Sequence, residues 1–254
     1  MRYYFGFVVV LCALSFQFLF NTMSKEVKAA NLLLRLEGKR AVVVGGTSGI
    51  GRGIAERLAK AGSDVTIVGR ESRRSQEVMA GLEPRNDEQK FAFVKCNCFL
   101  LSEVNKCVEK LLDSSEERGI DYLVMTHGMA TIQGFTPSEE EGLDQKLALH
   151  VYSRAAFAKG LLPALEKSDD PRILSVLSAG IHSAYIGYKT DPELCNGGYS
   201  IKNAADAGGF YNDIFLDSLS RENSNVAFFH AAPGFVNTST LNFFFFFLFI
   251  AAST

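Results

Sequence analysis

The feature that most constrains this chain is a glycine-rich loop between an apolar run and an amphipathic stretch. The run Ala41–Val44 predicts a short buried strand, and the loop 45–51, Gly-Gly-Thr-Ser-Gly-Ile-Gly, follows it at once. Apolar residues then recur at helical spacing from Ile50 to Ala61, which predicts one buried helix face. Gly62 stands where helices commonly end in a left-handed glycine. The order of strand, loop and helix predicts a nucleotide-binding βα unit.

The loop has a physical reason to contain glycine. A dinucleotide pyrophosphate must approach the backbone closely, which residues without a Cβ allow. The helix N-terminus then offers free N–H groups and a positive dipole end to the phosphates. Because the glycine spacing departs from G-x-G-x-x-G, a glycine-rich turn without a ligand is the alternative. The loop residues predicted to bind the cofactor are Gly45, Thr47, Ser48, Gly49, Ile50 and Gly51.

Apolar runs alternate with helical stretches along the rest of the chain as far as Thr238. Strands separated by helices pair in parallel through right-handed crossovers. The sequence therefore predicts an α/β protein with a doubly wound parallel sheet, a Rossmann fold, over residues 34–238. Further strands are predicted at 65–68, 91–94, 122–125, 173–177 and 226–229, and long helices at about 142–165 and from about 200 onward.

Composition and charge exclude other classes of protein. The chain carries 26 Lys and Arg against 28 Asp and Glu, a net charge of −2, so we expect no nucleic-acid partner. Apolar residues make up 47% of the chain and charged residues 21%, a globular rather than disordered balance. The 5 cysteines do not form a disulfide scaffold. Cys96 and Cys98 have no second pair nearby, so no metal site is predicted.

These motifs resemble those of the short-chain dehydrogenases/reductases, whose loop reads T-G-x-x-x-G-x-G; Val44 stands in the threonine's place. The resemblance runs from about Leu36 to Thr238. The long insertion between Ser178 and Tyr199 is most similar to retinol-dehydrogenase-like members. The resemblance implies strand order 3-2-1-4-5-6 and hydride transfer between NAD(P) and a carbonyl or alcohol. Members of the family continue after the position of Thr238 with a helix pair and a seventh strand. The resemblance therefore also implies that the seventh strand is missing here.

The residue after the second strand predicts which cofactor binds. An NAD enzyme places an acid there for the ribose hydroxyls, whereas Arg70 suits a 2′-phosphate. We therefore expect NADP(H) to be favoured over NAD(H), with a solvated basic helix start as the alternative. Asn97 stands where the family usually has an Asp that contacts the adenine. The motifs after the fourth and sixth strands add Gly128, Pro233, Gly234 and Thr238 to the predicted cofactor contacts.

The resemblance also implies a catalytic set. Ser178 matches the serine that hydrogen-bonds the carbonyl oxygen, and Tyr199 matches the proton donor in the family's Y-S-x-x-K-A-A. In the family the lysine lowers the pKa of the tyrosine. Here Asn203 takes the lysine's place, and Lys202, one residue early, is expected to meet Tyr199 because residues three apart are neighbours on a helix. His150 replaces an asparagine, either as a proton relay or as a structural histidine.

A second tyrosine competes with the first. Tyr185 and Lys189 have the family's Y-x-x-x-K spacing, but Pro192 ends any helix there, so we expect Tyr199 to be the acid. The displaced lysine leaves open a nucleotide-binding protein without turnover. The unusual ends of the chain leave open a non-functional product of a wrong gene model. The expected partner is a small-molecule carbonyl or alcohol, and a homo-oligomer is an open alternative to a monomer.

The two ends differ from the middle. Residues 3–20 carry no charge, and at about 1.5 Å per residue they just span a bilayer core. Residues 1–22 are interpreted as a membrane anchor, a cleaved signal or an extension translated by mistake before Met23. Residues 239–254 include the run Phe243–Phe247, and we expect this tail to be aberrant sequence from an intron or frameshift. The expected location is the cytoplasm, with a membrane tether through residues 3–20 left open.

Overall fold

The computed structural model describes residues 25–234 and 236 of the 254. Met1–Leu36 and Glu37–Thr254 form two separate units. In the first, residues 25–33 are helical and exposed. No helix among the described residues is long and apolar enough to cross a membrane. The candidate anchor at 3–20, Thr238 and the tail at 239–254 lie outside the described residues.

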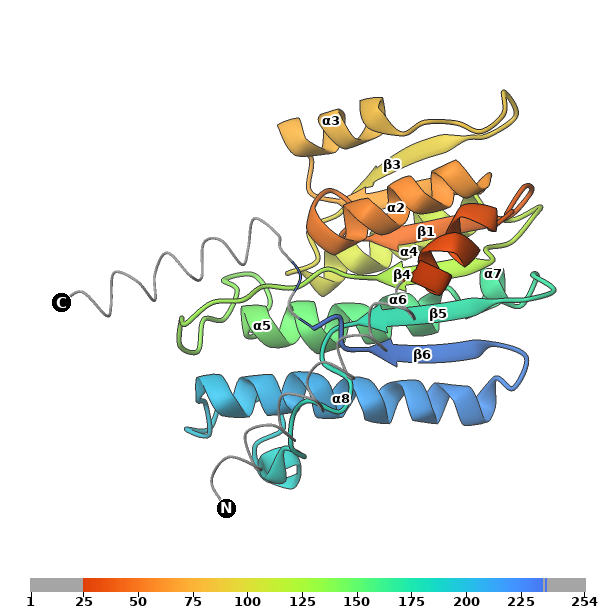
Figure 1. The fold of residues 1–254 in the computed structure, drawn as a ribbon. Helices are drawn as coiled ribbons and strands as arrows, with labels where there is room; N and C mark the ends of the chain where they lie inside the picture. Colours follow the sequence, from red (N-terminus) through yellow and green to blue (C-terminus); the bar gives the residue numbers. More distant parts are fainter. Residues whose placement is uncertain (1–24, 235, 237–254) are drawn as a thin grey trace, which may run out of the picture. The chain divides into compact units, whose positions relative to one another are not determined.

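The second unit is built on a parallel sheet with 6 strands in the order β3-β2-β1-β4-β5-β6 (Figure 1). The chain moves outward from β1 to β3, then returns to β4 on the other side of β1, so a topological switch point lies between β1 and β4. The predicted Rossmann fold and strand order are confirmed. The seventh strand that is expected to be missing would follow residue 236, outside the described residues, so this expectation stays a prediction. The strands are β1 (Arg40–Val44), β2 (Asp64–Gly69), β3 (Phe91–Lys95), β4 (Tyr122–Met125), β5 (Arg172–Val176) and β6 (Ala227–Ala231).

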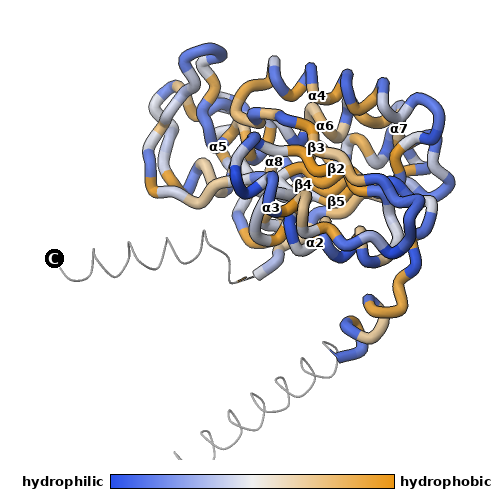
Figure 2. The backbone as a smooth tube through the Cα atoms, turned by 90° about the horizontal axis from the view of Figure 1, so that it is seen from above, coloured by the Kyte–Doolittle hydropathy of each residue, from blue (hydrophilic) through white to orange (hydrophobic). Residues whose placement is uncertain are grey.

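Helices cover both faces of this sheet, and the apolar strands lie between them (Figure 2). One layer consists of α2 (Gly49–Ala61) and α3 (Arg73–Gly81). The other includes α4 (Leu101–Asp113), α6 (Ser153–Gly160) and α8 (Ile201–Glu222).

Alternation along β1 explains the two layers. Val43 packs into the cluster with Ala55 and Ala59 of α2, whereas Val42 and Val44 pack into the cluster beneath α4 and α6. Successive side chains of a strand point to opposite faces, so a strand buried on both faces is apolar throughout.

The helix expected over about 142–165 differs from the prediction. Gly142 has a φ of 69° and belongs to a turn, and the helix begins only at α5 (Gln145–Leu147). A π-helical turn, η1 (Ala148–Tyr152), then leads into α6, and α7 (Leu162–Leu165) is a separate short helix. Because a π-turn adds one residue to the helical repeat, it changes which side chains face the interior, and such turns are frequent at functional sites.

Candidate active site

The glycine loop is packed tightly against the segment that follows β4. Gly45 has a φ of 84°, and a Cβ on it would lie 2.6 Å from the backbone nitrogen of His127. A Cβ on Gly51 would collide with the Thr126 hydroxyl and with the carbonyl oxygen of Gly45. Neither position therefore accepts a side chain, and the loop holds its backbone at the switch point of the sheet.

The N-terminus of α2 is free to receive an anion. Ser48 at its N-cap makes no side-chain hydrogen bond to the helix, and the first turn holds no acidic residue. At the other end, Gly62 has a φ of 105° and caps the helix as predicted. Since the first N–H groups of a helix have no partner within it, they and the positive dipole end face whatever occupies the loop.

A cavity of about 370 Å³ lies over this helix end. Its walls come from the glycine loop and from the segments after β2, β3 and β4, at the carboxyl ends of the strands. Ligands of open α/β sheets bind at this edge. The predicted cofactor contacts that line it are Gly45, Thr47, Ser48, Gly49, Ile50, Gly51, Arg70, Asn97 and Gly128.

Arg70 is the cation on the wall of this cavity. Its side chain is exposed, and it forms none of the ion pairs found among the described residues, whereas the nearby Arg73 is paired with Glu77. The glycine loop, the uncapped helix and a free guanidinium together suit a ligand with several phosphates.

A second cavity, of about 330 Å³, adjoins the first; both are lined by Ile50, Thr126, Gly128 and Met129. The structure brings three further predicted residues to its walls, Ser178 after β5, His150 from η1 and Pro233 after β6. Gly234 has a φ of 67° and is exposed outside both sets of walls.

His150 is held as a neutral acceptor. Its Nε2 accepts a hydrogen bond of 3.1 Å from the N–H of Met129. Burial, reinforced by the charge of Arg154, lowers the pKa of His150 to about 3. The imidazole therefore fixes the segment after Gly128, where the two cavities join.

Arg154 is a residue that sequence reasoning missed. It is fully buried and lines the second cavity. Its guanidinium donates to the carbonyl oxygens of Met125 and His127 at 3.2 and 2.5 Å, and to the Ser175 hydroxyl at 2.6 Å. Burial lowers its pKa to about 9. These bonds fix the carboxyl end of β4, and the sequence offers no sign that one arginine of a helix points inward.

Tyr199 does not line the walls of either cavity. Its hydroxyl oxygen accepts a hydrogen bond of 2.7 Å from Nζ of Lys146, and the Gln133 carbonyl oxygen lies 3.4 Å away. Lys202 makes no hydrogen bond to Tyr199; it pairs with Asp206 and keeps its side chain 73% exposed. Lys146 is the second residue that sequence reasoning missed.

Tyr185, the other candidate for the catalytic acid, makes a hydrogen bond within the fold. Tyr185 is buried, and its hydroxyl donates to the carbonyl oxygen of Asp191 over 2.9 Å. Lys189, at the end of the short helix η2 (Ile186–Lys189), lies over the ring of Tyr188 instead.

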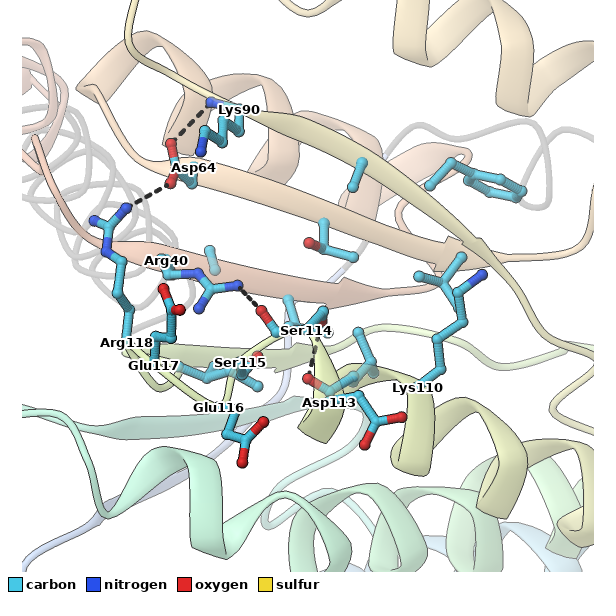
Figure 3. A pocket seen from close by; sticks show the side chains of 18 residues that line it. Arg40, Asp64, Lys90, Lys110, Asp113, Ser114, Ser115, Glu116, Glu117 and Arg118 are labelled. Atoms are coloured by element: carbon cyan, nitrogen blue, oxygen red, sulfur yellow. Dashed lines mark hydrogen bonds and ion pairs between the residues drawn. The ribbon is translucent and has the colours of Figure 1, made fainter.

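A third cavity, larger than these two, lies elsewhere and has a volume of about 510 Å³ (Figure 3). It is lined from the amino-terminal ends of β1 and β2 and from the end of α4. The charged side chains of Arg40, Asp64 and Arg118 bond to one another or to nearby backbone. Arg118 pairs with Asp64 at 3.6 Å, and Arg40 donates to the carbonyl oxygen of Ser114 at 2.9 Å. Because it opens at the edge opposite the glycine loop, it is not the candidate active site.

Comparison with known proteins identifies the family. The model of the short chain dehydrogenase family matches residues 39–190. Oxidoreductase AN1596 of Emericella nidulans is 32% identical over 218 residues, and oxidoreductase andH of Emericella variicolor is 31% identical over 228 residues. Each alignment covers 85% of this chain, and the chain spans 64% of the length of each relative.

Solved structures share the fold. A short chain dehydrogenase from Burkholderia cenocepacia J2315, in complex with NADP, matches with a TM-score of 0.61 at 23% identity, over 81% of this chain and 78% of that one. The RhlG/NADP complex of Pseudomonas aeruginosa matches with a TM-score of 0.62 at 19% identity, over 82% and 77% of the two chains. With the family model covering more than half of its length, this chain belongs to the short-chain dehydrogenase family.

Proposed function

We propose that the protein is an NADP(H)-dependent oxidoreductase that interconverts a carbonyl and an alcohol by hydride transfer. The observation that carries the proposal is the pair of joined cavities, with a free helix N-terminus and Arg70 on the first and Ser178 on the second. Two relatives named as oxidoreductases support the activity, and a structural neighbour in complex with NADP supports the cofactor.

Different residues of the chain would hold different parts of the cofactor. The glycine loop and the first turn of α2 would hold the pyrophosphate, Arg70 the 2′-phosphate and Asn97 the adenine. Gly128, where the cavities join, and the segment from Pro233 to Thr238 would hold the nicotinamide half, with Thr238 outside the described residues. When bound, NADPH supplies the hydride.

Two side chains would act on the substrate oxygen. The Ser178 hydroxyl makes no hydrogen bond among the described residues and borders the second cavity, so it is free to donate to a carbonyl oxygen. Tyr199 would supply the proton, after its hydroxyl turns toward that oxygen. Burial raises the pKa of Tyr199 to about 12, so its phenol keeps its proton at neutral pH, as an acid must.

The test is a titration followed by a turnover assay. The full chain is titrated with NADPH and with NADH by cofactor fluorescence, and NADPH consumption is then followed over a panel of ketones and aldehydes. Tighter NADPH binding with consumption on at least one carbonyl supports the proposal. Failure to bind either NADPH or NADH would refute the proposal.

A nucleotide-binding protein without turnover is the second candidate. The position of Tyr199, outside the walls that Ser178 lines, favours it, as does the pairing of Lys202 with Asp206. NADPH binding without consumption on any carbonyl of the panel would select this candidate.

We also propose a subgroup, an oligomeric state and a location for the protein. They are the retinol-dehydrogenase-like subgroup, a homo-oligomer, and a cytoplasmic catalytic domain tethered to a membrane through residues 3–20. Gel filtration tests the oligomer. Membrane fractionation of cells that express the full chain, compared with residues 23–254, tests the tether.

A further inference from the structure

The ammonium of Lys146 lies directly against the hydroxyl of Tyr199. The Nζ–Oη distance is 2.7 Å, and Nζ lies 5.3 Å from the centroid of the tyrosine ring. The side chain reaches this position from α5, 53 residues earlier in the sequence, and Lys146 is only 5% exposed. It also donates to the carbonyl oxygen of Gln133, so its position is fixed by two partners.

The two residues of α8 that the family motif would place against Tyr199 have other partners. Asn203 donates from its side chain to the carbonyl oxygen of Gly198 at 2.7 Å. Lys202 is paired with the buried carboxylate of Asp206. Among the described residues, Lys146 is therefore the cation that contacts the Tyr199 hydroxyl.

The charge of this ammonium is not cancelled by a bonded carboxylate. The nearest acid along the chain is Asp144, whose carboxylate accepts hydrogen bonds from the backbone N–H groups of Thr136, Lys146 and Leu147. No ion pair joins Lys146 to a carboxylate among the described residues. In a buried site, such a charge stabilises an anion that forms beside it.

The hydrogen bond from Lys146 does not use the phenol proton of Tyr199. A lysine ammonium has three donors and no acceptor, so Tyr199 accepts this bond through its oxygen. Its own proton is donated to the Gln133 carbonyl oxygen over 3.4 Å, a long and therefore weak hydrogen bond. A phenol held in this way is ready to give its proton to a better acceptor.

We propose that Lys146 is the positioning residue of Tyr199: it holds the tyrosine oxygen and stabilises the phenolate that proton transfer leaves behind. This inference rests on the proposed function. In the step, the O–H bond of Tyr199 breaks and its electron pair stays on the phenolate oxygen. The proton forms the O–H bond of the alcohol, whose carbon takes the hydride and whose oxygen keeps the former carbonyl π pair. Water then restores the phenol.

The variants compared in the full chain are Lys146→Met, Lys146→Arg, Lys202→Met and, as a matched control, Lys159→Met. Lys159 is exposed on α6. We expect Lys146→Met to bind NADPH normally and to lose on the order of 100-fold in kcat, the usual size of a general acid–base contribution. Lys146→Arg should recover part of this loss, Lys202→Met should lose less, and Lys159→Met should match the unmodified chain.

A pH profile separates this role from a merely structural one. Alcohol oxidation needs the phenolate, so its rate should rise with pH, and loss of the ammonium should move that rise to higher pH. The other groups that face the pair are the Asp144 carboxylate, which opposes the phenolate, and His150, which is neutral. Lys146→Arg should return the profile toward that of the unmodified chain.

The outcomes distinguish this inference from the proposed function. An active chain whose Lys146→Met variant keeps both kcat and pH profile overturns the role of Lys146 alone. So does a Lys146→Met variant that loses NADPH binding together with turnover, with no recovery in Lys146→Arg, because that result describes a structural lysine. An unmodified chain that binds NADPH and consumes none refutes the proposed function and this inference together.

Discussion

The guanidinium carbon of Arg70 lies 5.8 Å from the centroid of the Phe99 ring. A cation over an aromatic face is held without losing its charge or its donors. Both residues line the first cavity, so the ring keeps the arginine at the wall where a 2′-phosphate would lie.

Replacing Arg70 should therefore change cofactor preference. We expect Arg70→Asp to weaken NADPH binding by about 10- to 100-fold, about 1.5–3 kcal/mol for a lost charge-assisted contact, and NADH binding far less. Fluorescence titration of both cofactors measures the ratio. Arg221→Asp, on the exposed side of α8, is the matched control. Equal losses for NADPH and NADH would sink the idea.

The two tyrosines should respond differently to loss of a hydroxyl. Tyr199→Phe should abolish turnover and leave NADPH binding intact, because only the proton donor is removed. Tyr185→Phe should cost about 1 kcal/mol of stability, since its hydrogen bond to Asp191 is lost, and should change the rate only modestly. Steady-state kinetics and urea unfolding measure the two effects. The reverse ranking of rates would move the active site into the insertion.

Two glycines of α2 offer a test of the loop. Gly51→Ala should destabilise the fold by about 1–3 kcal/mol and prevent NADPH binding, because its Cβ meets Thr126 and the backbone of Gly45. Gly53→Ala places its Cβ in open space and should stabilise the helix by about 0.5–1 kcal/mol. Thermal unfolding with and without NADPH compares them. Tight binding by Gly51→Ala would show that the loop adapts.

His150 should make the fold sensitive to acid. Its pKa is about 3 in the fold and near 6.5 in an unfolded chain, so between these values the unfolded state binds the extra proton. Stability should therefore fall as the pH drops below about 6.5, by up to about 1.4 kcal/mol per pH unit for this group. His127, whose pKa burial also lowers, acts in the same direction. His150→Asn should lose less stability per pH unit, measured by urea unfolding at a series of pH values. An unchanged dependence of stability on pH would contradict this role of His150.

The strands and the cofactor loop were predictable because local patterns specify them. Apolar runs such as 122–125 and the glycine loop carry their structure in consecutive residues, and they appear where expected. The π-turn at 148–152 has no sequence mark, so the helix around it was predicted as continuous. Lys146 and Arg154 were missed for a related reason. Both are ordinary helix cations in sequence, and only tertiary packing turns them inward, toward Tyr199 and the end of β4.

The contact between Gly45 and the backbone at His127 has a consequence for synthesis of the chain. The glycine loop belongs to the first βα unit, but part of the surface that shapes it comes from the segment after β4, which leaves the ribosome more than seventy residues later. A nascent chain that ends before Thr126 has the complete glycine motif and lacks its support. The proposed nucleotide site is therefore completed late in translation, when the second half of the sheet docks beside the first.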